Sequence, residues 1–143
     1  MERLTQDLQT ELMPLLHELH QEVGEFADWP IKMDWMPYQY AQEMGNLLLI
    51  TARDNGALKG FLAFLVLDHP HYGVKFGRQD CIYLAPELRG KMTGVRMYKY
   101  AEKKLKLMGA KAFTTHTRTG NFFFGGLLEA LGYHITEMTY TER

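Results

Sequence analysis

The segment with the clearest capacity for chemistry is a basic, glycine-containing junction between a short apolar run and a helical pattern. It reads Pro-Glu-Leu-Arg-Gly-Lys-Met-Thr-Gly over residues 86–94. The first amides of a helix have no intrahelical acceptor, and the helix dipole favours negative charge there, so such a junction binds anions. Gly90 and Gly94 permit close approach of the backbone, and Arg89 and Lys91 add positive charge. The arrangement suits a diphosphate, but an ordinary soluble turn uses the same residue types, and spacing alone does not decide between the two.

Histidines and the single cysteine are the other groups that could bind a metal or react. His69 and His71 flank a proline in a predicted loop. Two histidines without a third nearby ligand make a weak metal site, so we predict no metal; these residues could instead line a substrate pocket. Cys81 lies in the apolar run Cys-Ile-Tyr-Leu, where no neighbour in the sequence would lower its pKa. We therefore expect a buried, unreactive thiol.

The N-terminal part of the sequence predicts two helices. Leucines and a valine recur at three- and four-residue steps over residues 4–23, which predicts an amphipathic helix that ends near Gly24. Pro14 falls inside this pattern, and we expect it to kink the helix or to move its start downstream. The aromatic-rich segment 26–40 predicts a packed connector, with a short helix at 37–44.

The rest of the sequence predicts a sheet whose strands are joined by a turn, a loop and two helices. Asp54-Asn55-Gly56 is a strong hairpin signal, because Asn and Gly tolerate positive φ. Proline and glycine predict a loop at 68–77. The predicted strands are 46–53, 57–67, 80–85, 111–117 and 134–141, and the predicted helices are 95–108 and 121–131. This order of elements predicts an α/β (α+β) fold class.

Length, charge and cysteine content limit the classes of protein. The 143 residues, 46% of them hydrophobic, are enough for one core, so we expect a single domain over residues 1–143. The 16 Lys plus Arg nearly balance 17 Asp plus Glu, so neither nucleic acid nor an anionic membrane is predicted as a partner. The apolar run 61–67 is too short for a membrane span, which needs about 20 residues. One cysteine excludes a disulfide framework and favours a reducing, cytoplasmic location.

The junction and the elements after it resemble the GNAT N-acetyltransferase superfamily. Residues 86–94 look like the family's coenzyme A loop, whose pattern Q/R-x-x-G-x-G/A follows a strand. The similarity continues through the helix 95–108 and the strand 111–117 to Leu131-Gly132-Tyr133, which resembles the family's L-G-F/Y. It is strongest from Phe61 to the C-terminus. The resemblance implies a mixed, mostly antiparallel central sheet flanked by helices.

The resemblance also implies an activity, which is transfer of an acetyl group from acetyl-coenzyme A to an amine of a small molecule or protein. A homodimer is left open. The residues expected to bind the cofactor are Tyr83, Leu84, Ala85, Arg89, Gly90, Lys91, Met92, Thr93, Gly94, Asn121, and Phe123 or Phe124. The side chains expected to form the acceptor wall or to pack in the core are Trp29, Trp35, Tyr38 and Tyr40. The His-Pro-His-Tyr segment resembles acetyltransferase-like proteins of tailed phages, which suggests a phage origin and a host-cytoplasmic location.

Acetyl transfer to an amine needs a base for the amine and an acid for the leaving thiolate. The resemblance places Asp80 where the family often has a carboxylate base; strand capping or an ion pair with Arg78 are its alternatives. His116, near the end of the next predicted strand, could take the amine proton near neutral pH or serve as a hydrogen-bonded structural histidine. Tyr133, Tyr140 or water could supply the acid.

Two positions depart from the family pattern. Met92 stands where the family has its first motif glycine, so we expect the loop to approach the phosphates less closely there or to rely on flanking amides. Leu128 stands where the family often has the tyrosine that protonates the thiolate. These departures motivate a second hypothesis, a GNAT-like fold that no longer catalyses and acts as a binding or structural module, for instance against a host or virion protein.

Overall fold

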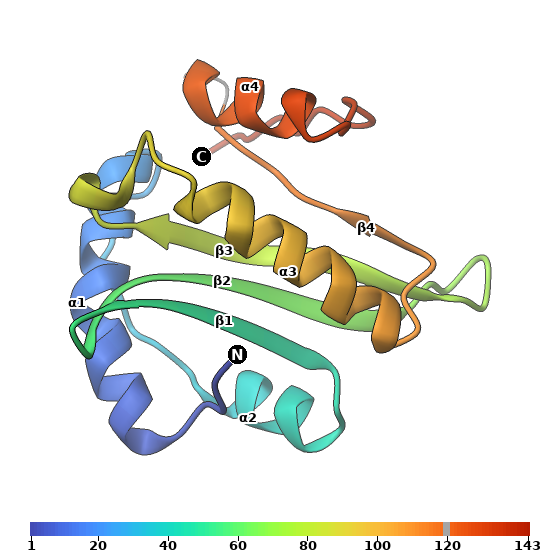
Figure 1. The fold of residues 1–143 in the computed structure, drawn as a ribbon, viewed down its shortest axis with the longest axis horizontal. Coiled ribbons are helices and arrows are strands. Elements are labelled where there is room, and N and C mark those ends of the chain that lie inside the picture. The colour runs from blue at the N-terminus through green and yellow to red at the C-terminus, as the bar shows by residue number, and fades with distance from the viewer. Residues whose placement is uncertain (119–120) are drawn as a thin grey trace.

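A four-stranded sheet forms the centre of the protein, with helices on both faces (Figure 1). The computed structural model describes residues 1–118 and 121–143, apart from the side chains of Phe122 and Phe123. The strands are β1 (Leu47–Asp54), β2 (Ala57–Asp68), β3 (Lys75–Leu84) and β4 (Ala112–Thr114), and they lie in the order β1-β2-β3-β4. β1, β2 and β3 are antiparallel neighbours, whereas β4 runs parallel to β3. The expected mixed, mostly antiparallel sheet flanked by helices is confirmed.

Helices α1 (Gln6–Val23) and α2 (Met36–Glu43) pack on one face of the sheet, and α3 (Thr93–Leu107) covers the other. Helix α4 (Phe122–Ala130) lies beyond the N-terminal half of α3 in Figure 1. A single 3₁₀ turn, Pro86–Leu88, separates β3 from the loop before α3. The 3₁₀ turn after β3 and the helix α4 therefore both lie near the start of α3.

Helix α1 begins at the start of its apolar pattern, so the expectation that Pro14 moves its start downstream is wrong. Thr5 caps the helix, and its hydroxyl oxygen accepts a hydrogen bond from the Leu8 amide at 3.2 Å. Pro14 lies on the exposed side, while Leu12 and Leu15 on either side of it are buried. Tertiary packing of the leucine face therefore outweighs the one backbone hydrogen bond that proline removes.

Alternation along the strands gives the protein two separate hydrophobic cores. In β1, Leu48 and Ile50 point into the core under α3, whereas Leu49 points into the core under α1 and α2. In β2, Leu62 and Phe64 belong to the α3 core. Successive side chains of a strand point to opposite faces, so a continuous apolar run of this kind indicates a sheet covered on both sides.

Two of the five predicted strands have other bounds in the structure, and a third is not a strand. β3 begins at Lys75 rather than at Asp80, because the hairpin with β2 continues through the segment predicted as loop. β4 is limited to Ala112–Thr114. The predicted strand 134–141 is irregular, and its Ile135, Met138 and Tyr140 are 73–87% exposed. A strand there would need the outer edge of β4, and three residues offer too short a ladder.

Candidate functional site

The strands β3 and β4 separate from each other at one end of the sheet. They pair only over Phe76–Arg78 with Ala112–Thr114. β3 then continues to Leu84, while the chain after Thr114 leaves towards α4 (Figure 1). Within the described residues, the edge of β3 that faces β4 thus has no strand partner over residues 79–84. Such an edge can pair with an extended ligand.

A buried glutamine bridges the two chain segments where the backbone ladder stops. Gln79 is 2% exposed, and its Oε1 accepts hydrogen bonds from the hydroxyls of Tyr98 and Thr115. Its Nε2 donates to the main-chain oxygen of His116 at 3.4 Å. Burial raises the pKa of Tyr98, which keeps the phenol protonated as a donor. Gln79 therefore fixes the backbone at His116, a role that the sequence analysis missed.

Asp80 is the extra residue of a β-bulge. The register passes from Ala63 opposite Cys81 to Phe64 opposite Gln79, which leaves Asp80 without a partner. The bulge puts Gln79 on the α3 face and Cys81 on the α1 face, and it turns Asp80 towards α2. Bulges occur beside active sites because they re-aim a side chain in this way. The expectation that Asp80 opens the strand is wrong.

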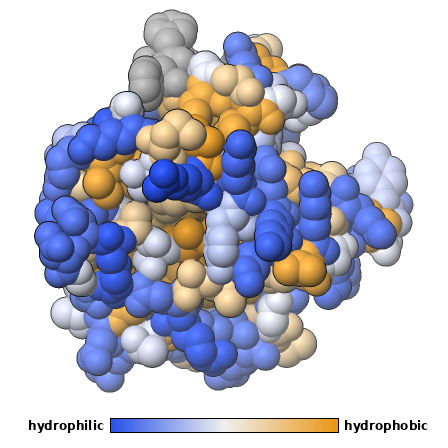
Figure 2. All heavy atoms as spheres, in the orientation of Figure 1, coloured by the Kyte–Doolittle hydropathy of each residue, from blue (hydrophilic) through white to orange (hydrophobic). Residues whose placement is uncertain are grey.

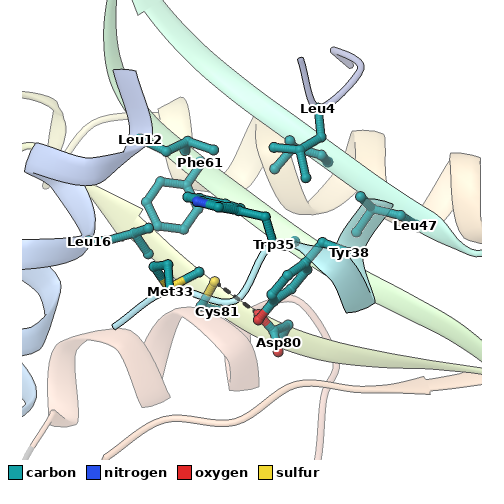
Figure 3. A pocket seen from close by; sticks show the side chains of 12 residues that line it. Leu4, Leu12, Leu16, Met33, Trp35, Tyr38, Leu47, Phe61, Asp80 and Cys81 are labelled. Carbon is teal, nitrogen blue, oxygen red and sulfur yellow. Dashed lines mark hydrogen bonds between the residues drawn. The ribbon is translucent and has the colours of Figure 1, made fainter. Parts of the chain in front are cut away.

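Two donors hold the Asp80 carboxylate. Its Oδ2 accepts a hydrogen bond from the Tyr38 hydroxyl at 2.9 Å and another from the Cys81 thiol at 3.3 Å (Figure 3). Burial raises the pKa of Tyr38 and that of Cys81, and the negative charge of Asp80 raises both further, so both groups keep their protons. Within the described part of the chain, Oδ1 accepts no hydrogen bond, and no ion pair joins Asp80 to Arg78. One carboxylate oxygen is thus anchored, and Asp80 lines both cavities described next.

Two cavities meet at Asp80. A polar cavity of about 210 Å³ is lined by Leu65, Leu67, Arg78, Gln79, Asp80 and His116. An apolar cavity of about 200 Å³ lies between the sheet, α1 and the segment that leads into α2. Burial lowers the pKa of His116, and the charge of Arg78 lowers it further. The imidazole is therefore neutral near pH 7 and able to accept a proton. The structure brings Asp80 and His116 to one site.

The predicted anion loop leads into the N-terminus of α3, whose first amides have no partner within the helix. The first helical hydrogen bond of α3 runs from the Arg96 amide to the Met92 oxygen at 2.9 Å, so the amides of Thr93, Gly94 and Val95 precede the ladder. Gly90 has φ +72°, a left-handed conformation that glycine adopts without strain. The Met92 side chain is 57% exposed and does not fill the loop. These residues fit a diphosphate.

Arg89 contacts the protein rather than the centre of the loop. Its Nε donates to the Leu84 oxygen at 2.7 Å, and its guanidinium forms an ion pair with Glu22 of α1 at 2.7 Å. The guanidinium also lies 5.3 Å from the centre of the Tyr83 ring, and burial raises the pKa of Tyr83 to about 12. One edge of β3 here pairs with β2, through Leu84 and the Ala85 amide. Lys91 is exposed as well, and within the described part of the chain it forms no ion pair.

The C-terminal candidates lie on the α3 side. Asn121 caps α4 by accepting a hydrogen bond from the Phe124 amide at 3.1 Å, and the Phe124 ring packs 5.9 Å from that of Tyr98. Tyr133 donates to Glu102 of α3 at 3.0 Å and lines neither cavity. Leu128 is 7% exposed and belongs to the α3 core. The structure therefore does not bring Tyr133 to Asp80. The side chain of Phe123 lies outside the described residues.

The remaining candidates divide between residues that line the apolar cavity and residues that lie away from both cavities. His69 and His71 pack against each other at the tip of the β2–β3 hairpin, with ring centres 5.6 Å apart, and line neither cavity. Trp29 and Tyr40 are exposed, whereas Trp35 and Tyr38 line the apolar cavity. Among the described residues, no three metal-binding side chains cluster. Over the same part of the chain, none of the helices has the length and apolarity to cross a membrane.

The chain belongs to the acetyltransferase (GNAT) family, whose sequence model matches residues 10–133. No curated protein sequence matches it significantly. Solved structures share the fold. A tetramutant of the BH1408 protein from Bacillus halodurans has a TM-score of 0.80 at 14% identity, over 99% of this chain and 97% of that one.

Two other solved structures are named acetyltransferases. A ribosomal-protein-alanine N-acetyltransferase from Brucella melitensis biovar Abortus 2308 has a TM-score of 0.69 at 21% identity, over 94% of this chain and 90% of that one. AAC(6')-Iy, solved with the bisubstrate analogue CoA-S-monomethyl-acetylneamine, has a TM-score of 0.65 at 17% identity, over 90% of this chain and 91% of that one. At these identities the likeness establishes the fold, and the family match establishes the membership.

Proposed function

We propose that the protein is an N-acetyltransferase that moves the acetyl group of acetyl-coenzyme A to an amine of a small molecule or protein. The observation that carries this proposal is the separation of β3 from β4 beside the open N-terminus of α3. This place offers an unpaired strand edge, which can pair with the amide-bearing arm of a long ligand. It also offers the free amides of a helix N-terminus, which can bind the diphosphate of the same ligand. The neighbour solved with a coenzyme A bisubstrate analogue supports this type of cosubstrate.

The cofactor side of the site uses main-chain groups. The amides of Thr93, Gly94 and Val95, together with Lys91, would hold the diphosphate, because they precede the helical ladder or carry positive charge. The free edge of β3, which ends at Leu84, would pair with the pantetheine arm, whereas the Ala85 amide already donates to the Lys59 oxygen of β2. Arg89 would first have to release the Leu84 oxygen. Asn121 and Phe124 would contribute by placing α4 rather than by contact, since both are engaged in capping and packing.

The acceptor side uses Asp80 and His116. When bound, acetyl-coenzyme A supplies a thioester whose carbonyl carbon forms a bond to the amine nitrogen while the carbon–sulfur bond breaks. Asp80 would hold the incoming ammonium through Oδ1, which is free of the Tyr38 and Cys81 bonds. The bound ammonium loses two protons as the amide forms: His116 would take one, since its lowered pKa keeps the imidazole neutral, and water would take the other. Water would protonate the thiolate, because Tyr133 is bonded to Glu102.

A pair of assays tests this proposal. Coenzyme A at about a hundred times its dissociation constant should add roughly 2.7 kcal/mol to the stability, which a thermal shift detects. Acetylated product should form from a panel of amines, and Asp80→Asn should lower kcat/KM by about a hundredfold or more. No shift at millimolar coenzyme A would refute the proposal. A shift without product from any amine, peptide or protein would instead establish a binding or structural module.

A further inference from the structure

The apolar cavity beside Asp80 has the chemistry of a binding site for a carbon ring. Its wall is almost entirely aliphatic and aromatic: Leu4, Leu12, Leu16, Met33, Trp35, Tyr38, Leu47, Leu49, Phe61 and Ala63, with Asp80 and Cys81 at one end. In Figure 3 the Trp35 indole and the Phe61 ring border the space, and the Tyr38 hydroxyl points to the carboxylate. Leu12, Phe61 and Ala63 are each less than 5% exposed. Met33, Trp35 and Tyr38 on the other side are half-buried, so the cavity is partly open to solvent.

The size of the cavity limits the ligand. Its volume is about 200 Å³. An engineered apolar cavity of about 150 Å³ stays dry and takes up benzene, whereas sites for drug-sized ligands start at about 300 Å³. A single ring with a short chain therefore fits, and a multi-ring molecule does not.

The charge of the cavity fixes the other end of the ligand. The lining of this apolar cavity includes one acidic residue, Asp80, whose Oδ2 accepts hydrogen bonds from Tyr38 and Cys81. A carboxylate at the border of an apolar space favours one ammonium group and orients it. The polar cavity with His116 begins at the same residue, so the nitrogen would lie between the two spaces.

We infer that the acceptor is a small monoamine on an aromatic or bulky hydrophobic frame, such as an arylalkylamine, with the ring in the apolar cavity and the amine on Asp80. This inference rests on the proposed function and specifies its substrate class. An aminoglycoside, with several amino groups on polar sugars, would meet one carboxylate and an apolar wall. Its other ammonium groups would lose hydration without gaining partners.

Fluorescence of Trp35 provides a direct test of occupancy. The chain has 2 tryptophans, and Trp29, which is 54% exposed and stacked on Phe26, lies outside the cavity. In a Trp29→Phe background, titration with 2-phenylethylamine should change the Trp35 emission with saturation. Ethylamine lacks the ring and 2-phenylethanol lacks the charge, so each should bind about tenfold more weakly or worse. Tobramycin, a polycationic aminoglycoside, should bind more weakly than 2-phenylethylamine.

A matched pair of variants tests the location. Ala63→Leu fills the cavity and should weaken 2-phenylethylamine by about tenfold or more. Ala57→Leu makes the same change at an exposed position of the same strand and should leave binding unchanged. Circular dichroism and the thermal shift with coenzyme A report whether each variant is folded. If Ala63→Leu does not fold, the comparison of the four ligands on the Trp29→Phe protein decides alone.

The outcomes separate this inference from the proposed function. Equal binding of ethylamine and 2-phenylethylamine, or tighter binding of tobramycin, overturns the substrate class even if coenzyme A stabilises the protein and another amine is acetylated. Unchanged binding in folded Ala63→Leu also overturns it. Absence of a coenzyme A shift refutes the proposed function, while the titration, which needs no cofactor, still reports whether the cavity holds an arylalkylamine.

Discussion

The two faces of the sheet differ in how completely they are packed. Under α3, the side chains of Leu48, Leu62, Phe64, Tyr98 and Leu105 are 0% exposed. The apolar cavity lies on the opposite side, where α1 and α2 cover the sheet, and the polar cavity lies where β3 separates from the chain after β4. Figure 2 views the α3 side and shows mostly hydrophilic residues over that helix, with hydrophobic ones gathered near α4.

This difference separates stability from ligand binding. Protein interiors reach the packing density of organic crystals, and a face packed in this way holds the fold together. A face with a void has lower local stability and can admit a ligand. The bulge at Asp80 divides the two functions within a single strand, since Gln79 serves one face and Cys81 the other.

The largest expected effect is on stability. Leu105→Ala on the α3 face should lower the free energy of unfolding by about 4 kcal/mol, because it opens a new cavity in a filled core. Leu12→Ala should cost about 2 kcal/mol, because this side chain already borders a void and has fewer atoms to lose contact with. Urea unfolding followed by circular dichroism measures both. Equal losses would contradict the difference between the faces.

A smaller effect concerns pH and the cavity face. Because the folded pKa of His116 lies below the ordinary value of 6.5, the unfolded chain binds a proton that the folded imidazole resists. The free energy of unfolding should therefore fall as pH drops below about 6.5, until the folded imidazole also protonates. In His116→Asn this part of the pH dependence should disappear. The control His17→Asn changes an exposed histidine on α1 and should keep the wild-type profile.

Urea midpoints between pH 7.5 and 5 provide the comparison. Parallel profiles for the wild type and His116→Asn would show that the imidazole titrates as in water, and would remove the support for His116 as a neutral base.

The smallest effect is expected at the ion pair that joins α1 to the loop before α3. The Arg89–Glu22 ion pair is 41% and 44% exposed, so Glu22→Gln should cost less than about 1 kcal/mol of stability. This loss should shrink in 1 M salt, where screening acts within about 3 Å. Thermal unfolding at low and high salt measures it, with Glu25→Gln as the control. A loss that does not depend on salt would contradict an exposed electrostatic contact.

Local patterns were sufficient to predict several elements. The Asn55-Gly56 turn has φ values of 49° and 83°, as the dipeptide predicts, and the leucine pattern gave α1. The loop before α3 and the end of α3 also follow from glycine, charge and apolar spacing. In each case the physical cause lies within a few residues, so the sequence contains the information.

Features that depend on distant partners could not be predicted. The bulge at Asp80 arises from the register between β2 and β3, and the short β4 arises from the separation of β3 from its neighbour. Gln79 lay outside the predicted strands, and its role depends on Tyr98 and Thr115, which come from other elements. The apolar cavity needs α1, the connector and the sheet together.

The bulge has a consequence for how this site can evolve. Because Asp80 has no partner in the ladder, another side chain can replace it without disturbing the pairing of β2 with β3. Deleting Asp80 would remove the bulge and restore the two-residue repeat, with Gln79 and Cys81 on the faces that they already occupy. The side chain at position 80 can therefore change, or be lost with one codon, while the pairing of β2 with β3 and both cores of the sheet are kept.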